Sequence, residues 1–214
     1  MSLELFNILI KSKEYRRSYY CEKEIITASE YYDKKIYLIE NGIVKISRLT
    51  EQGEEMILVI LTSGQVFGAN LILEEFHPNY ICESLNSETV LCEFDIECVK
   101  RVIEKDQHTE FDLLSIIGKQ FSEMERRIKV LCNNSAEQRL VDVLKEFKDK
   151  FDHLSDNEEN IIIDMPLNQD EISNYIRTTR VTTNKLINKL KNNLLIEYQQ
   201  KNIMLKKDFF KHYK

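Results

Sequence analysis

Residues 167–190 read LNQDEISNYIRTTRVTTNKLINKL, and this stretch predicts two short helices joined by a tight turn. Asn168 is placed to N-cap the first helix, and Glu171 follows at the spacing of a capping box. Ile172 and Ile176 lie at i and i+4, which gives this helix an apolar stripe. The pattern is typical of a helix-turn-helix.

The second helix is predicted to follow a turn at Arg177 and Thr178, with Thr179 as its N-cap. Its expected inward face consists of Leu186, Ile187 and Leu190. The outward face follows the spacing i, i+1, i+4, i+5 and i+8, and consists of Arg180, Val181, Asn184, Lys185 and Asn188.

This outward face contains no acidic residue, and every member except Val181 can form hydrogen bonds. Arg, Lys and Asn are side chains that meet base edges in the DNA major groove. The alternative is an ordinary solvated surface helix. Cap, turn and polar face agree in one register, which favours a DNA-reading helix.

The charge of the chain is divided unevenly between its two ends. The net charge of the 214 residues is −6, but residues 165–214 carry ten Lys and Arg against four Asp and Glu. Residues 1–164 carry twenty against thirty-two. An acidic protein with a basic C-terminal quarter fits a DNA-reading module joined to something else.

The composition is that of a soluble globular protein long enough for two modest domains, with 43% hydrophobic and 31% charged residues. No apolar run is long enough to span a membrane. Residues 1–6 lack the basic start and apolar core of a signal peptide, so we expect a cytoplasmic protein.

The cysteines are odd in number, and no pair has Cys-x-x-Cys spacing. Disulfide frameworks and zinc sites usually show tighter patterns, so we expect reduced, partly buried thiols. A redox-sensing or cluster-binding role is the alternative. The five residues are Cys21, Cys82, Cys92, Cys98 and Cys132.

Between Tyr19 and Asp95, short apolar runs separated by turn residues predict an antiparallel barrel or jelly roll. Asn41-Gly42 is a strong signal for a two-residue hairpin, and Gln52-Gly53 marks another turn. The expected strands cover residues 24–27, 36–39, 43–46, 56–60 and 89–94.

A long helix is predicted from about His108 to Cys132, after short helices at residues 3–13 and 97–105. Its apolar residues repeat with spacings of 3 and 4, as in a heptad seam. The strict period and a length of about 37 Å favour a seam between two subunits over packing on the protein's own barrel. The expected dimer residues are Leu114, Ile117, Phe121, Met124, Ile128 and Leu131.

Residues 133–135 are predicted to end the long helix, with Ser135 and Gln138 forming a second capping box. A strand hairpin after the helix-turn-helix would be the wing of a winged helix. The elements expected here are a helix over 136–151, a polar loop over 152–160, a strand at 161–163, and hairpin strands at 194–198 and 203–205.

The order of β-roll, long helix, hinge and winged helix-turn-helix resembles the Crp/Fnr family of bacterial transcription regulators over essentially the whole chain. Residues 36–46, 53–58 and 64–68 are similar to the family's hairpin, G-x-E and G-x-x-x-G signature. Residues 179–185 resemble its S-R-E-T-V-x-R recognition helix, with Arg180, Thr182 and Lys185 on the basic and hydroxyl positions.

The resemblance implies an α+β fold in three parts: an antiparallel, jelly-roll-like β-roll sensor over 1–105, a dimerisation helix and hinge over 106–134, and a winged helix-turn-helix DNA-binding domain over 135–214. It implies a homodimer on a palindromic double-stranded operator, with an unknown small-molecule effector and RNA polymerase as candidate partners. It implies no cofactor, metal or membrane. We expect Arg180 and Lys185 to read bases, Thr178, Thr179 and Thr182 to contact phosphates, and Asn184 to do either.

Two pairs of residues depart from the cyclic-AMP-binding members. Those members use the Glu of a Gly-Glu pair for the ribose and the Arg of an Arg-Ser pair for the phosphate. The matching places here hold Gly68-Ala69 and, by ungapped match, Asn79-Tyr80. Neither can neutralise a phosphate as a guanidinium does, so we expect no response to cyclic AMP. The candidate effector-pocket residues are Gly68, Ala69, Asn70, Asn79 and Tyr80.

Two further departures fall in the helix-turn-helix. Val181 replaces the Glu that many members use to accept a cytosine amino group; a valine cannot accept that hydrogen bond, but it could contact a thymine methyl. Arg177 replaces the usual turn Gly, so it has to tolerate a strained turn conformation.

Two other functional classes are alternatives to a DNA-binding regulator. One is an effector-binding regulatory subunit without DNA activity, like the cyclic-nucleotide domains of kinases or channels, and the basic winged helix argues against it. The other is a cupin-type enzyme, which needs clustered His and Glu on strands. The histidines are scattered, so we expect no enzymatic activity; they are His77, which looks like a solvated loop residue, His108, His153 and His212.

Overall fold

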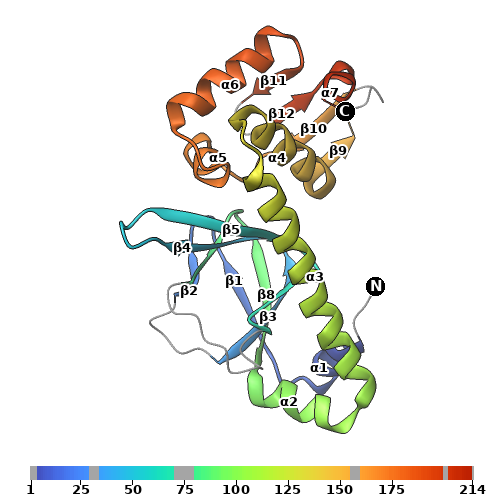
Figure 1. Cartoon of the computed structure of the whole chain (residues 1–214). Helices are drawn as coiled ribbons and strands as arrows, with labels where there is room; N and C mark the ends of the chain where they lie inside the picture. The colour runs from blue at the N-terminus through green and yellow to red at the C-terminus, as the bar shows by residue number, and fades with distance from the viewer. Residues whose placement is uncertain (1–3, 29–33, 70–79, 155–159, 200–201, 214) are drawn as a thin grey trace. The chain divides into compact units, whose positions relative to one another are not determined.

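The computed structural model describes residues 4–28, 34–69, 80–154, 160–199 and 202–213. The chain forms two compact units, Met1–Arg126 and Arg127–Lys214, and helix α3 continues through the boundary between them (Figure 1). Each unit has its own sheets and its own buried core. The expected α+β class is confirmed.

The N-terminal unit is an antiparallel roll of two four-stranded sheets, ordered β1-β8-β3-β6 and β2-β7-β4-β5. All five expected strands are present, each within three residues of its expected ends. Three more strands, β1, β6 and β7, were not expected, because RRSYY and YICES look polar and VF is short. The strands are β1 Arg16–Tyr20, β2 Ile25–Ala28, β3 Lys35–Asn41, β4 Ile43–Leu49, β5 Glu55–Thr62, β6 Val66–Phe67, β7 Tyr80–Ser84 and β8 Thr89–Asp95.

The prediction of a two-residue hairpin at Asn41-Gly42 is wrong. Strands β3 and β4 on either side of it belong to different sheets, so the chain crosses from one layer of the roll to the other at this point. Gly42 has φ +110°, and a Cβ there would lie 2.6 Å from Thr89 Oγ1. Only glycine therefore fits at this corner, where the chain passes close to the start of β8. The turn at Gln52-Gly53 does close a hairpin, between β4 and β5.

Two apolar clusters hold the roll together. The first lies between the sheets and includes Tyr37 stacked on Phe67 with ring centroids 4.6 Å apart. The second lies between one sheet and helices α1 Glu4–Ser12, α2 Ile96–Lys105 and α3 Gln107–Cys132. Gln120 of α3 donates a 3.0 Å hydrogen bond to the Val66 carbonyl. The start of α3 is therefore part of the roll.

The C-terminal unit packs its helices on a third antiparallel sheet, of order β11-β12-β10-β9. Residues 152–154 pair with β10 as an edge strand, so the expectation of a loop there is wrong; their backbone bonds come from the apolar neighbour strand. The elements are α4 Ala136–Phe151, β9 Asp152–Leu154, β10 Ile161–Asp164, α5 Gln169–Tyr175, α6 Arg180–Asn192, β11 Ile196–Gln199, β12 Asn202–Leu205 and α7 Lys207–His212.

The second capping box is only half formed. The Gln138 N–H donates to Ser135 Oγ at 3.3 Å, as expected for an N-cap. The Gln138 side chain donates to Asp142 Oδ1 at 2.9 Å instead of returning to Ser135, because Asp142 offers a charged acceptor one turn ahead.

Candidate nucleic-acid interface and dimer seam

Helix α5 begins with the predicted capping box. Asn168 Oδ1 accepts from the Glu171 N–H at 3.0 Å, and Glu171 Oε2 accepts from the Asn168 N–H at 2.9 Å. Ile172 and Ile176 are fully buried, so the apolar stripe faces the core. This fixes the start and the rotation of the first helix.

The turn between the two helices contains a left-handed residue. Arg177 has φ +50°, the conformation anticipated from its place at the usual Gly, and its side chain is exposed. The Thr178 N–H donates to the Ser173 carbonyl at 2.9 Å, which closes the end of α5. The chain then enters α6 without an intervening loop.

Helix α6 is N-capped by Thr179, whose Oγ1 accepts from the Thr182 N–H at 3.2 Å. Ile187 and Leu190 are buried, and Leu186 is half-buried. Thr183, which the sequence did not single out, is completely buried. Of the candidate DNA residues, Thr179, Arg180, Val181, Lys185 and Asn188 are exposed, whereas Thr178, Thr182 and Asn184 are half-buried.

Ion pairs already engage part of the charge on α6. Arg180 Nε lies 3.2 Å from Asp170 Oδ1 of α5, and both side chains are more than half exposed. Lys189 pairs with Glu137 at 2.5 Å, and hydrogen bonds from Lys189 and Tyr213 lower the pKa of Glu137. Among the described residues, none forms an ion pair with Lys185.

The six seam residues of α3 are more exposed than the residues of a hydrophobic core. Ile117 is half-buried, but the other five are exposed, from 36% for Leu131 to 63% for Phe121. Phe111 is 72% exposed on the same helix and was missed, because it lies one residue off the heptad position. Contiguous exposed apolar side chains of this kind are typical of surfaces that mediate protein–protein contacts.

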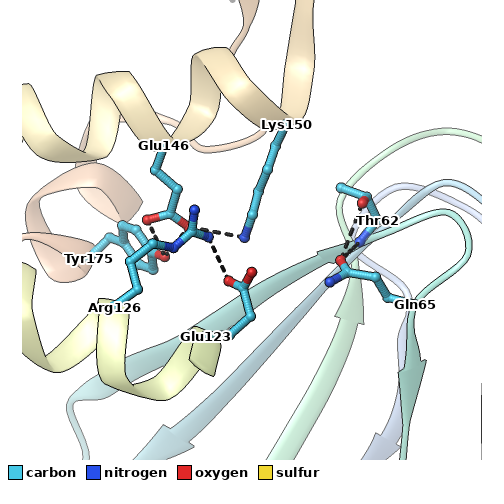
Figure 2. Close-up of polar contacts among 7 residues, drawn as sticks. All are labelled: Thr62, Gln65, Glu123, Arg126, Glu146, Lys150 and Tyr175. Carbon is cyan, nitrogen blue, oxygen red and sulfur yellow. Dashed lines mark hydrogen bonds and ion pairs between the residues drawn. The ribbon is translucent and has the colours of Figure 1, made fainter. Parts of the chain in front are cut away.

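The candidate effector region is described only in part. Gly68 has φ +83°, and a Cβ there would lie 2.6 Å from the Lys35 carbonyl oxygen, so glycine permits a close approach to β3. Ala69 is buried and Tyr80 is half-buried at the start of β7. Asn70 and Asn79 lie outside the described residues, as does His77. Nearby, Gln65 Oε1 accepts from the Thr62 N–H at 2.7 Å (Figure 2).

The buried thiols are poorly suited to redox chemistry. Burial raises the pKa of Cys82 to about 12, and burial beside Glu40 raises the pKa of Cys92 to about 11. A high pKa suppresses the reactive thiolate. Across the described ranges, no group of three or more His, Cys, Asp or Glu is placed to hold a metal ion. Within the same ranges, every helix is too short or too polar to cross a bilayer.

Comparison with known families supports the reading of both units. Residues 16–106 match the cyclic nucleotide-binding domain, and residues 138–207 match the Crp-like helix-turn-helix domain. The chain belongs to the Crp/Fnr family of transcription regulators. Its homologues include the global nitrogen regulator of Synechococcus elongatus, 27% identical over 79% of this chain and 76% of that protein. The fumarate and nitrate reduction regulatory protein of Vibrio cholerae is 22% identical over 80% and 67%.

Solved structures of other Crp/Fnr regulators share the fold of this family member. The c-di-GMP-responsive regulator CLP of Xanthomonas campestris has a TM-score of 0.80 at 14% identity, over 96% of this chain and 99% of that one. A CooA mutant from Carboxydothermus hydrogenoformans has a TM-score of 0.74 at 22% identity, over 93% and 86%. At these identities the likeness concerns the fold.

Proposed function

We propose that this Crp/Fnr regulator acts as a homodimer that binds a palindromic operator in double-stranded DNA. The observation that carries the proposal is the outward face of α6, where Arg180, Val181, Lys185 and Asn188 are exposed while Ile187 and Leu190 are buried. A capped helix with such a face can enter the major groove with its first turn against the bases.

The individual roles follow from side-chain chemistry and position. Arg180 and Lys185 would read base edges, and Val181 would contact a thymine methyl. Thr178, Thr179 and Thr182 lie at the positive N-terminal end of α6, where hydroxyls and free N–H groups suit a phosphate. Thr179 Oγ1 already accepts a hydrogen bond from the Thr182 N–H. Thr179 would therefore contact a DNA phosphate by donating its hydroxyl proton. Asn184 and Asn188 would contact bases or phosphates.

The second copy would cover the exposed stripe of α3. Two such helices packed through Leu114, Phe121, Met124 and Ile128 would remove four exposed apolar side chains of that helix from water. The dimer would also set the spacing of the two recognition helices. The three-part division into sensor, dimerisation helix and DNA-binding domain rests on this arrangement.

The effector is proposed to be something other than cyclic AMP, and less anionic. Ala69 offers no carboxylate to a ribose, and neither residue of the Asn79-Tyr80 pair carries a positive charge. A buried anion without a cationic partner is very costly. RNA polymerase remains a candidate partner, and we propose no catalytic role.

Operator selection from random duplexes, run with and without cell extract, tests this proposal. Enrichment of a two-fold symmetric site would support it, and a change in enrichment with extract would indicate an effector. Failure to enrich any sequence under either condition would contradict DNA binding and favour an effector-binding regulatory subunit without a DNA role.

A further inference from the structure

The carbonyl groups that end helix α5 are held by an arginine from the next helix back. Arg139 of α4 donates from Nε to the Ile176 carbonyl at 2.8 Å and from Nη2 to the Arg177 carbonyl at 3.4 Å. Its Nη1 donates to the Asn133 carbonyl at 2.6 Å, in the junction between α3 and α4. One guanidinium therefore joins that junction to the helix-turn-helix turn.

A second arginine reaches the same turn from the last part of α3. Arg127 is 9% exposed, and its Nη2 donates to the Tyr175 carbonyl. Its Cζ lies 3.6 Å from the centre of the Tyr175 ring, so the guanidinium stacks on the tyrosine. The Tyr175 hydroxyl donates to Glu146 Oε1 at 3.2 Å, and Lys150 Nζ lies 3.0 Å from the same oxygen. Figure 2 shows both side chains turned to this carboxylate.

These contacts satisfy the carbonyl groups of Tyr175 and Ile176, which the end of α5 leaves without helical partners, and the Arg177 carbonyl in the turn that follows. They are charge-assisted, and a cation at a helix C-terminus is also favoured by the helix dipole. Stability alone does not explain Arg127, since its Nε and Nη1 have no hydrogen-bond partner among the described residues. A buried charge with unpaired N–H groups costs free energy.

We propose that Arg127 and Arg139, together the arginine clamp, are positioning residues that fix the orientation of recognition helix α6 relative to the end of α3. The clamp rests on the proposed DNA-binding function. Arg127 lies between the seam residues Met124 and Ile128, so a shift of the seam moves its guanidinium. Because α6 starts directly after the clamped turn, the two recognition helices of a dimer would keep one separation and one angle.

The dependence of affinity on half-site spacing measures this orientation. Each added base pair moves the half-sites apart by about 3.4 Å and rotates one by about 34°. We expect wild-type protein to prefer one spacing of the selected operator strongly. In Arg127→Met and Arg139→Met, we expect the preference for that spacing over its neighbours to fall roughly threefold to thirtyfold. Affinity for a duplex carrying a single half-site should fall less than the spacing preference does.

Lys145→Met is the matched control. Lys145 Nζ donates to the Tyr213 carbonyl at 2.6 Å, a contact of the same kind in the same unit but away from the turn. We expect this variant to keep the wild-type spacing preference. Equal losses on single and paired half-sites in the clamp variants would mean a general loss of structure, and an unchanged preference would mean no positioning role; either result overturns the proposal.

Amide hydrogen exchange tests the clamp without DNA. Exchange over residues 174–179 should be faster in both clamp variants and unchanged in Lys145→Met. If wild-type protein selects no operator, the proposed function fails, and this exchange measurement decides the clamp by itself. Exchange as slow as in wild type would then refute it.

Discussion

Arg180, the first residue of recognition helix α6, forms an ion pair with Asp170 of the preceding helix, with Nε 3.2 Å from Oδ1. Both side chains are exposed, so the pair itself contributes little to stability. The ion pair matters for DNA binding instead, because Arg180 would have to leave Asp170 to reach a base. Under the proposed function, the residue that we expect to read a base is therefore paired with an acid in the absence of DNA.

Arg180→Ala should reduce operator affinity by about 1–3 kcal/mol and relax the preference at one base pair per half-site. The reason is its place in the exposed first turn of α6. The measurement is a binding titration against the operator and its single-base variants. Lys191→Ala, which removes a cation from the last turn, should weaken binding to all sequences alike. The same uniform loss in Arg180→Ala would make Arg180 a phosphate contact.

Replacing both Phe121 and Met124 with Glu should split the dimer. The two side chains are 63% and 62% exposed in the single chain, so the monomer tolerates the change, whereas a helix pair would bury like charges together. Sedimentation gives the mass in solution. Glu125→Gln, on an exposed position of the same helix outside the seam, should stay dimeric. A double variant that remains dimeric at micromolar concentration would place α3 against something else.

Cyclic AMP should not bind at physiological concentration. The absence of a guanidinium at Asn79-Tyr80 and of a carboxylate at Ala69 leaves the phosphate without a counter-charge. Calorimetric titration of the full-length protein measures this. A dissociation constant in the low micromolar range would overturn both the placement of Asn79 and the argument drawn from it.

Leu194→Gly should stabilise the C-terminal unit by about 0.5–1 kcal/mol. Leu194 follows α6 with φ +58° and is 80% exposed, so its side chain adds backbone strain and little packing. The next residue closes the helix end, because the Leu195 N–H donates a 3.0 Å hydrogen bond to the Leu190 carbonyl. Urea unfolding gives the change. Asn193→Gly, at φ −82°, should lower stability instead, and equal effects from both substitutions would remove strain as the explanation.

Glu137 should make stability depend on pH at the acidic end. Hydrogen bonds from Lys189 and Tyr213 lower its pKa in the folded protein, so its contribution is present above the ordinary glutamate pKa and is lost as pH falls through the lowered one. Glu137→Gln should cost about 1 kcal/mol or less at neutral pH, with the difference from wild type shrinking below about pH 4. Asp149→Asn, at an exposed carboxylate, is the control for unfolding curves at both pH values. A constant difference for Glu137→Gln at both would exclude this carboxylate as the cause.

Local features could be predicted well from the sequence. The Asn168–Glu171 box, the Thr179 cap and the two faces of α6 all depend on residues within one or two turns of one another. Helix α4 has the expected ends, and the long helix starts within one residue of its expected position. Short-range hydrogen bonds and helical periodicity depend only on residues close to one another in the sequence, so they can be predicted without knowing the tertiary structure.

Pairing between distant segments could not be predicted in the same way. Asn41-Gly42 specified a sharp change of direction, but only the packing of β8 beside Gly42 decided that the chain changes sheet there. Polar strands such as β1 and β9 form because an apolar neighbour supplies their backbone partners. Their own side chains do not carry the signal.

The sequence by itself determined the helix-turn-helix, the apolar stripe of α3 and the exposed polar face of α6, because each is a periodic pattern within one helix or across one turn. Only the tertiary structure decided that Arg127 and Arg139 meet the carbonyls of Tyr175 and Ile176, which lie 48 and 37 residues further along the chain. These contacts form because folding brings each guanidinium to the unpaired carbonyl groups at a helix end. No spacing of neighbouring residues in the sequence predicts such a contact.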